Sequence, residues 1–277
     1  MKRIFAFILL LFTISITQAQ DYFVAHIKGD IEVKGTNKKV AVGDQLNKTD
    51  ELRFLTQDAN AVVMTMEGKR MVLNGKETKK NNDGEFISFV QDVVLPLSSN
   101  IQLSTRGGDP NNIQDFKTFF GEEKYVIIGD ELKVKPDPGV FPIDNGWSFI
   151  YRYETGSRPV NKIVANQGAE IVLDRKQLYK TKGVVVDPEK SYPVKLFYFN
   201  SNNKDAKELV TFHPVFVDEN TLTVELKSVA TFLENNNVMK GRELMDELYK
   251  FVLDVHGPIN KSIFFDWLNS KELITRG

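Results

Sequence analysis

The residues best suited to acid–base or metal chemistry are scattered along this sequence. Its three histidines are His26, His213 and His256, and no two of them lie at the short spacing of a metal-binding motif. His256 stands before Gly257 at the expected end of a helix, where an imidazolium ion would interact favourably with the helix dipole. We therefore expect each histidine to be hydrogen-bonded or at the surface.

Two pairs of adjacent acids, Glu122–Glu123 and Asp130–Glu131, are the other candidates for chemistry. A glycoside hydrolase needs two carboxyl groups roughly 5–10 Å apart across a cleft, and adjacency in the sequence does not supply that arrangement. The sequence has no Gly-x-Ser-x-Gly, His-Glu-x-x-His or EF-hand pattern and no cysteine. We predict a protein that is not an enzyme and has no cofactor or metal site; an enzyme with an unfamiliar carboxylate site is the alternative.

The first nineteen residues resemble a cleaved export signal. Lys2 and Arg3 form a positive start, and the thirteen residues 4–16 contain only Thr13 and Ser15 as polar members. A membrane-spanning helix needs about 20 apolar residues, so this run is too short to be an anchor. Small residues at the usual positions place cleavage after Ala19. We expect a periplasmic or secreted protein, and the missing cysteine excludes a lipoprotein.

The composition narrows the possible partners. Outside the expected leader the chain has 34 basic and 37 acidic residues, whereas nucleic-acid-binding proteins usually carry a basic excess. No second apolar run is long enough to span a bilayer. We therefore expect no nucleic acid and no membrane insertion after the signal is removed. Another envelope or secreted protein is the expected partner.

Residues 20–102 have the pattern of a β domain, in which short apolar runs alternate with turn residues. Residues 27–33 (Ile-Lys-Gly-Asp-Ile-Glu-Val), 42–46 (Val-Gly-Asp-Gln-Leu) and 50–54 (Asp-Glu-Leu-Arg-Phe) resemble the FecR-like β domain, and residues 61–73 are similar to its next two strands. Gly29 and Gly43 fit turns that require positive φ. The resemblance implies a periplasmic or secreted module that contacts another protein. The family's cytoplasmic part and membrane helix have no counterpart here.

Residues 103–121 have the composition of a linker with a short helix, and residues 122–226 that of a second β domain. Its strongest expected strand is 147–153, where Trp147, Phe149 and Tyr151 point one way and Ser148, Ile150 and Arg152 the other. Further strands are expected near 125–128, 132–134, 170–173, 184–186, 192–199 and 209–217. About seven strands over a hundred residues suggest an immunoglobulin-like sandwich.

Residues 227–277 change to a helical period and are expected to form a small C-terminal cap. Leu244, Leu248, Phe251, Val252 and Val255 define one amphipathic helix, which Gly257-Pro258 ends. Asn260 is expected to cap a second helix that carries Ile263, Phe264, Trp267 and Leu268.

These features predict a mainly β, cysteine-free exported protein that works as a protein-binding or assembly module of the periplasm or cell envelope. The alternative is a protein that binds a carbohydrate or other polymer through exposed aromatic rings. Trp147, Tyr151 and Trp267 are the candidates for that role, because aromatic faces stack on apolar ligand surfaces.

The leader gives the first test. Expression of the full chain in a secreting bacterium should yield a mature protein whose N-terminal sequence begins at Gln20. The Ala19→Arg variant should accumulate as the unprocessed chain, since signal peptidase requires a small residue there. An exported wild-type product that keeps residues 1–19 would contradict the expected cleavage.

Overall fold

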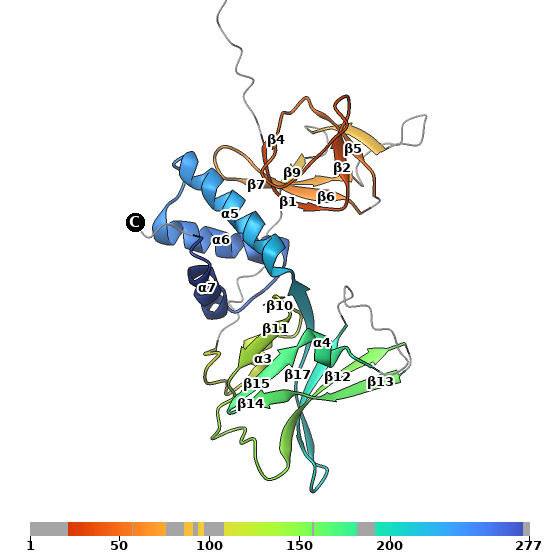
Figure 1. The fold of residues 1–277 in the computed structure, drawn as a ribbon, viewed down its shortest axis with the longest axis vertical. Helices are drawn as coiled ribbons and strands as arrows, with labels where there is room; N and C mark the ends of the chain where they lie inside the picture. Colours follow the sequence, from red (N-terminus) through yellow and green to blue (C-terminus); the bar gives the residue numbers. More distant parts are fainter. Residues whose placement is uncertain are drawn as a thin grey trace, which may run out of the picture. The chain divides into compact units, whose positions relative to one another are not determined.

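The computed structural model describes residues 22–56, 58–75, 86–90, 94–96, 108–156, 158–181 and 192–273, and it is mainly β with a few helices (Figure 1). The chain divides into two compact units, Met1–Pro96 (unit 1) and Leu97–Gly277 (unit 2), which are described separately below. None of the described helices is long and apolar enough to cross a membrane. The expected leader and its cleavage site at Ala19 lie outside the described residues.

Unit 1 contains two antiparallel sheets, ordered β4-β1-β6-β7-β9 and β3-β2-β5-β8. Their strands are β1 (Tyr22–Lys28), β2 (Ile31–Val33), β3 (Lys38–Lys39), β4 (Gln45–Leu46), β5 (Glu51–Phe54), β6 (Asn60–Met64), β7 (Arg70–Asn74), β8 (Phe86–Phe89) and β9 (Val94–Pro96). The core between them is aliphatic, and Val24, Leu52, Val63 and Leu73 are completely buried in it. The β domain expected from the alternating apolar runs is confirmed.

The turns of unit 1 follow the glycines. Gly29 and Gly43 have φ of 72° and 94°, as the sequence predicts for turns that require positive φ. Gly68, at φ 79°, lies in the reversal between β6 and β7, which pair as an antiparallel hairpin. Gly29 is additionally confined, because a Cβ at this position would overlap the Thr56 hydroxyl and lie 3.0 Å from Ala59 Cα.

Unit 2 contains a five-stranded sheet ordered β10-β17-β16-β12-β13 and a three-stranded sheet ordered β11-β15-β14. Its strands are β10 (Lys124–Ile128), β11 (Glu131–Val134), β12 (Trp147–Thr155), β13 (Arg158–Ile163), β14 (Ala165–Gln167), β15 (Glu170–Asp174), β16 (Val194–Asn200) and β17 (Ala206–Val217). Only the β10–β17 pair is parallel among the described ladders of this unit. The polar strands β13 and β14 were not predicted, because their exposed residues show no apolar alternation. The strand expected at 184–186 lies outside the described residues.

The core of unit 2 is aromatic. From the five-stranded sheet, Phe149, Tyr151 and Phe212 point into it. The short helix α3 (Phe116–Phe120) adds three phenylalanines, and the Phe120 ring stacks on Phe212 with centroids 4.3 Å apart. The expected short helix is therefore present. Residues 108–121 are nevertheless not a linker, because their aromatic side chains form part of this core.

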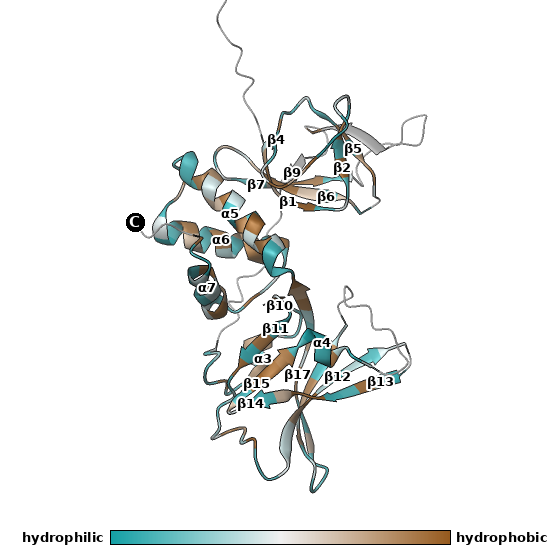
Figure 2. Ribbon diagram, viewed as in Figure 1, coloured by the Kyte–Doolittle hydropathy of each residue, from teal (hydrophilic) through white to brown (hydrophobic). Residues whose placement is uncertain are grey.

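Helices follow the sheets. After α4 (Arg175–Leu178), the chain ends with α5 (Glu219–Asn235), α6 (Gly241–Val255) and α7 (Lys261–Ser270). The Asn260 side chain accepts a hydrogen bond from Ile263 N, so the predicted cap of α7 is confirmed. Figure 2 shows hydrophobic residues recurring along α5 and α6. α5 begins eight residues before the expected boundary at 227, because Asp218 caps it by accepting a hydrogen bond from Thr221 N.

Gly29 provides a test of the fold of unit 1. Gly29→Ala should lower the free energy of unfolding by about 2–3 kcal/mol, because backbone strain adds to displacement of Thr56, whose hydroxyl accepts a hydrogen bond from Asp30 N. Gly35→Ala is the matched control: it has φ of 90° and no heavy atom within 4 Å of an added Cβ, so only the strain of about 1 kcal/mol applies. Urea denaturation measures both, and equal losses would contradict the close approach at Gly29.

Candidate functional site

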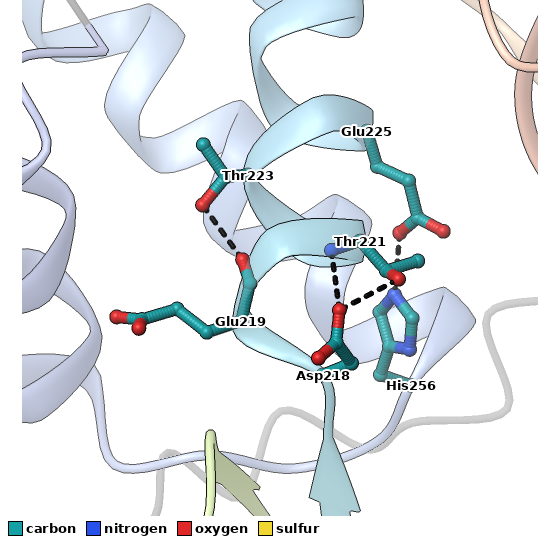
Figure 3. Close-up of polar contacts among 6 residues, drawn as sticks. All are labelled: Asp218, Glu219, Thr221, Thr223, Glu225 and His256. Atoms are coloured by element: carbon teal, nitrogen blue, oxygen red, sulfur yellow. Dashed lines mark hydrogen bonds and ion pairs between the residues drawn. The ribbon is translucent and has the colours of Figure 1, made fainter.

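A buried hydrogen bond between two titratable side chains of unit 2 joins α5 to the end of α6. His256 Nε2 donates to Glu225 Oε2 over 2.8 Å, and the two side chains are only 11% and 2% exposed. Glu225 lies two turns from the N-terminus of α5, while His256 is the C-cap residue of α6 (Figure 3). The expected helix-end position of His256 is therefore correct, and the tertiary structure adds a carboxylate partner.

A carboxylate bonded to an imidazole is one half of a catalytic triad, which also needs a hydroxyl that the imidazole can deprotonate. Thr221 carries a hydroxyl on the same helix, but this hydroxyl donates to Asp218 Oδ1 over 2.9 Å (Figure 3). These contacts favour a structural role for Glu225 and His256, in which they join two helices.

A second polar cluster lies inside the aromatic core. The hydroxyls of Tyr151 and Tyr179 are 3.0 Å apart, and Tyr153 Oη donates to the Leu178 carbonyl over 3.0 Å. Burial raises the pKa of Tyr153 to about 12 and holds the pKa of Tyr151 well above its ordinary value, because a buried phenolate loses its hydration. These phenols stay protonated at neutral pH. Their hydrogen bonds pair the polar groups that are buried in the core. They do not prepare a tyrosine to act as a catalytic base.

The adjacent acids considered from the sequence lie at or near the surface, and three of them, Glu122, Asp130 and Glu131, have cationic partners. Asp130 receives a hydrogen bond from Lys176, which holds the pKa of its carboxyl below the ordinary value. Glu122 forms an ion pair with Lys117 over 2.8 Å. Neither contact creates a pair of carboxyls that face each other, so these residues show no geometry for glycoside hydrolysis.

The outer face of the five-stranded sheet carries an apolar groove of about 340 Å³, lined by Ile150, Arg152, Asn161, Phe197, Phe199 and Ala206. Strand alternation puts these side chains opposite those in the core: on β16, Phe197 and Phe199 alternate with the buried Leu196 and Tyr198. The same rule confirms the two predicted faces of β12. Phe149 and Tyr151 are buried, whereas Ile150 and Arg152 lie on the outer face.

Strand register arranges the outer face in rows. Ile150 lies directly opposite Phe197 on one side and Ile163 on the other, and Ile163 is 74% exposed. Residues opposite each other on one face have Cβ atoms about 5 Å apart, so the three side chains form a continuous apolar row across β13, β12 and β16. We call this row, together with the groove, the outer-face site.

The next row of the outer-face site is polar. Arg152 lies opposite Asn161 on β13 and Lys195 on β16. Lys195 forms an ion pair with Glu208 over 3.0 Å. Within the described part of the chain, neither Arg152 nor Asn161 makes a side-chain hydrogen bond or ion pair. The site therefore combines an apolar floor with Arg152, a cation that pairs with none of the described residues.

The aromatic residues proposed from the sequence are not gathered on one surface. Tyr151 is completely buried, so its ring offers no face to a ligand. Trp147 is half-buried and stacks on Tyr198 with centroids 4.3 Å apart. Trp267 is half-buried on α7, and its indole N–H donates to Glu219. The three residues belong to different environments, and none of them lines the groove.

Sequence reasoning missed the contribution of Glu225 and of β16 to the sites described here. Glu225 sits on an amphipathic helix beside Leu226 and shows no motif; only the fold brings it to His256, 31 residues away. Phe197 and Phe199 did carry a signal, because they alternate with apolar residues that fill the core. A strand that is apolar on both faces is buried on both faces or presents a binding surface.

Comparison with known proteins adds no assignment. No protein-family model matches the chain, and no curated protein matches it at significant similarity. The FecR-like resemblance of residues 22–75 therefore stays a prediction.

The structural role of the Glu225–His256 pair can be tested by substitution. Glu225→Ala should lower the free energy of unfolding by about 1.5–3 kcal/mol, the usual worth of a hydrogen bond to a charged group. Glu225→Gln should lower the free energy of unfolding by less, because the glutamine amide can still form a hydrogen bond with the imidazole. Lys227→Ala, at an exposed position of the same helix, should change stability by less than about 0.5 kcal/mol. Thermal and urea unfolding measure the series; a Glu225→Ala protein as stable as Lys227→Ala would contradict the assignment.

Proposed function

We propose that this chain is an exported, non-catalytic binding module that recognises another polypeptide of the periplasm or cell envelope through the outer-face site of unit 2. The single observation that carries the proposal is the apolar row Ile163–Ile150–Phe197, held open to solvent beside a groove of about 340 Å³. Exposed apolar side chains gathered on a rigid sheet mark interaction surfaces, whereas scattered ones do not.

The sheet order of unit 2 supports an immunoglobulin-like assignment. In chain order the eight strands would be A, B, C, C′, D, E, F and G of that fold. One sheet then reads B-E-D (β11-β15-β14), and the other reads A-G-F-C-C′, with the first strand parallel to the last (β10-β17-β16-β12-β13). Immunoglobulin-like domains commonly serve as recognition modules, although a fold alone does not define a function.

The two turns of unit 1 support the FecR-like interpretation in the same way. Gly29 and Gly43 both adopt positive φ, and the intervening strands pair as short antiparallel segments. Under this interpretation unit 1 is a second β module. Its predicted role is contact with another protein.

A polypeptide suits the outer-face site better than a carbohydrate does. Sugar-binding surfaces present flat aromatic rings to the ligand, and the indoles of Trp147 and Trp267 are occupied by Tyr198 and Glu219. The outer-face site instead offers side chains of mixed shape along a shallow groove. Polypeptide side chains can interdigitate with such a surface over several residues.

Site-specific photo-crosslinking tests this function. In its own cells, the protein carrying Ile163→benzoylphenylalanine should form a discrete adduct with a second polypeptide. The same probe at Val140, another exposed apolar residue of unit 2, is the control and should not form that adduct. Phe197→Ser should abolish the adduct from position 163 while the protein remains folded. A stable, exported protein that gives no adduct from position 163, or the same adduct from position 140, would overturn the proposal.

A further inference from the structure

The length of the outer-face site fits a short extended segment. Successive rows on one face of a strand are about 6.7 Å apart, so the distance from the row of Phe199 to that of Arg152 is about 13 Å. Four residues of extended chain span the same distance. The groove lies on a sheet face and is open to solvent, so a small molecule would be covered on one side only. A polypeptide gains contact area along its length and suits this shape.

The charges define one end of the segment. The guanidinium of Arg152 stands beyond the apolar row, and no described residue pairs with it. Lys195, in the same row, is neutralised by Glu208. A guanidinium presents parallel N–H donors that match the two oxygens of a carboxylate. The complementary ligand therefore carries a carboxylate at one end and apolar side chains before it.

Asn161 and the sheet edge further restrict the mode of binding. The Asn161 carboxamide lies opposite Arg152 and can both donate and accept a hydrogen bond, as a peptide group requires. β13 is the edge strand of the sheet. It begins with Arg158 and Pro159, and polar residues alternate along the rest of the strand. Proline and charged side chains disfavour the addition of another strand to an edge. The segment would thus lie across the sheet face rather than extend the sheet.

We infer that the outer-face site binds the carboxyl-terminal end of an apolar polypeptide, with Phe197, Phe199 and Ile150 contacting its last side chains and Arg152 holding its terminal carboxylate. This inference rests on the proposed function and names the chemistry of the partner. The occupant is a polypeptide end whose final residues are large and apolar. Asn161 bonds to the last peptide group.

The test uses two peptides that differ in one group. Both are labelled with fluorescein at the N-terminus and end in Phe-Val-Leu, one as the free acid and the other as the amide. Fluorescence anisotropy with the folded protein, residues 20–277, should show the free acid binding about fivefold more tightly, as expected for an exposed ion pair of about 1 kcal/mol. Phe197→Ser should lower the affinity for both peptides.

Charge variants of the protein separate the carboxylate contact from general affinity. Arg152→Gln should lower the affinity for the free-acid peptide about fivefold and leave the affinity for the amide peptide unchanged. Arg158→Gln is the control, because it removes the same charge from the other face of β13. That face bears Val160, which packs against the core. This variant should bind both peptides with unchanged affinity. Glu154→Gln should strengthen the free acid about twofold, because Glu154 follows Arg152 on the outer face and repels a carboxylate.

The outcomes distinguish this inference from the proposed function. Equal binding of acid and amide, or an unchanged acid affinity in Arg152→Gln, overturns the carboxylate contact even when the crosslink from position 163 forms. If the protein binds decanoate and neither peptide, the inference that the ligand is a polypeptide is overturned, and the ligand is instead an acyl chain with a carboxylate. Absence of both the crosslink and peptide binding overturns the inference and the function together.

Discussion

The two-residue repeat of side chains along β12 and β16 is the constraint on which the rest of unit 2 depends. Packing Phe149, Tyr151, Leu196 and Tyr198 on the inner face forces the residues between them outward. A shift of one residue in register would exchange the two faces and bury Arg152. The aromatic core therefore fixes the outer-face site as firmly as it fixes the fold.

The same core organises elements that are distant in the sequence. Phe119 and Phe120 of α3 pack on Tyr125 of β10, and Phe120 also stacks directly on Phe212 of β17. Phe116 of the same helix packs on Phe149 of β12. At the other end of β17 the chain passes straight into α5, which Asp218 caps. The hydrogen bond between Glu225 and His256 then joins α5 to α6. Helices and sheets are thus linked by caps and buried polar contacts, in a chain that has no cysteine for disulfides.

Much of the fold could be predicted because strands and helices have different apolar periods. Alternation along 147–153 and the three- and four-residue spacing from Leu244 to Val255 each indicated the correct element. β13 and β14 could not be predicted in this way. Their residues are mostly exposed, and they form strands because β12 and β15 supply hydrogen-bonding partners. Residues 103–121 resembled a linker because short-range composition does not reveal that the aromatic side chains of α3 enter a core.

By itself the sequence determined the mainly β character, the glycine turns, the Asn260 cap of α7 and the two faces of β12, since each depends on neighbouring residues and local backbone preferences. Only the tertiary structure decided which strands became neighbours. That choice placed Ile163, Ile150 and Phe197 in one row, set Arg152 in the next row, where no described residue pairs with it, and brought Glu225 to His256. These contacts join residues separated by 13 to 47 positions, and a pairing over that distance follows from packing of the whole unit rather than from local sequence.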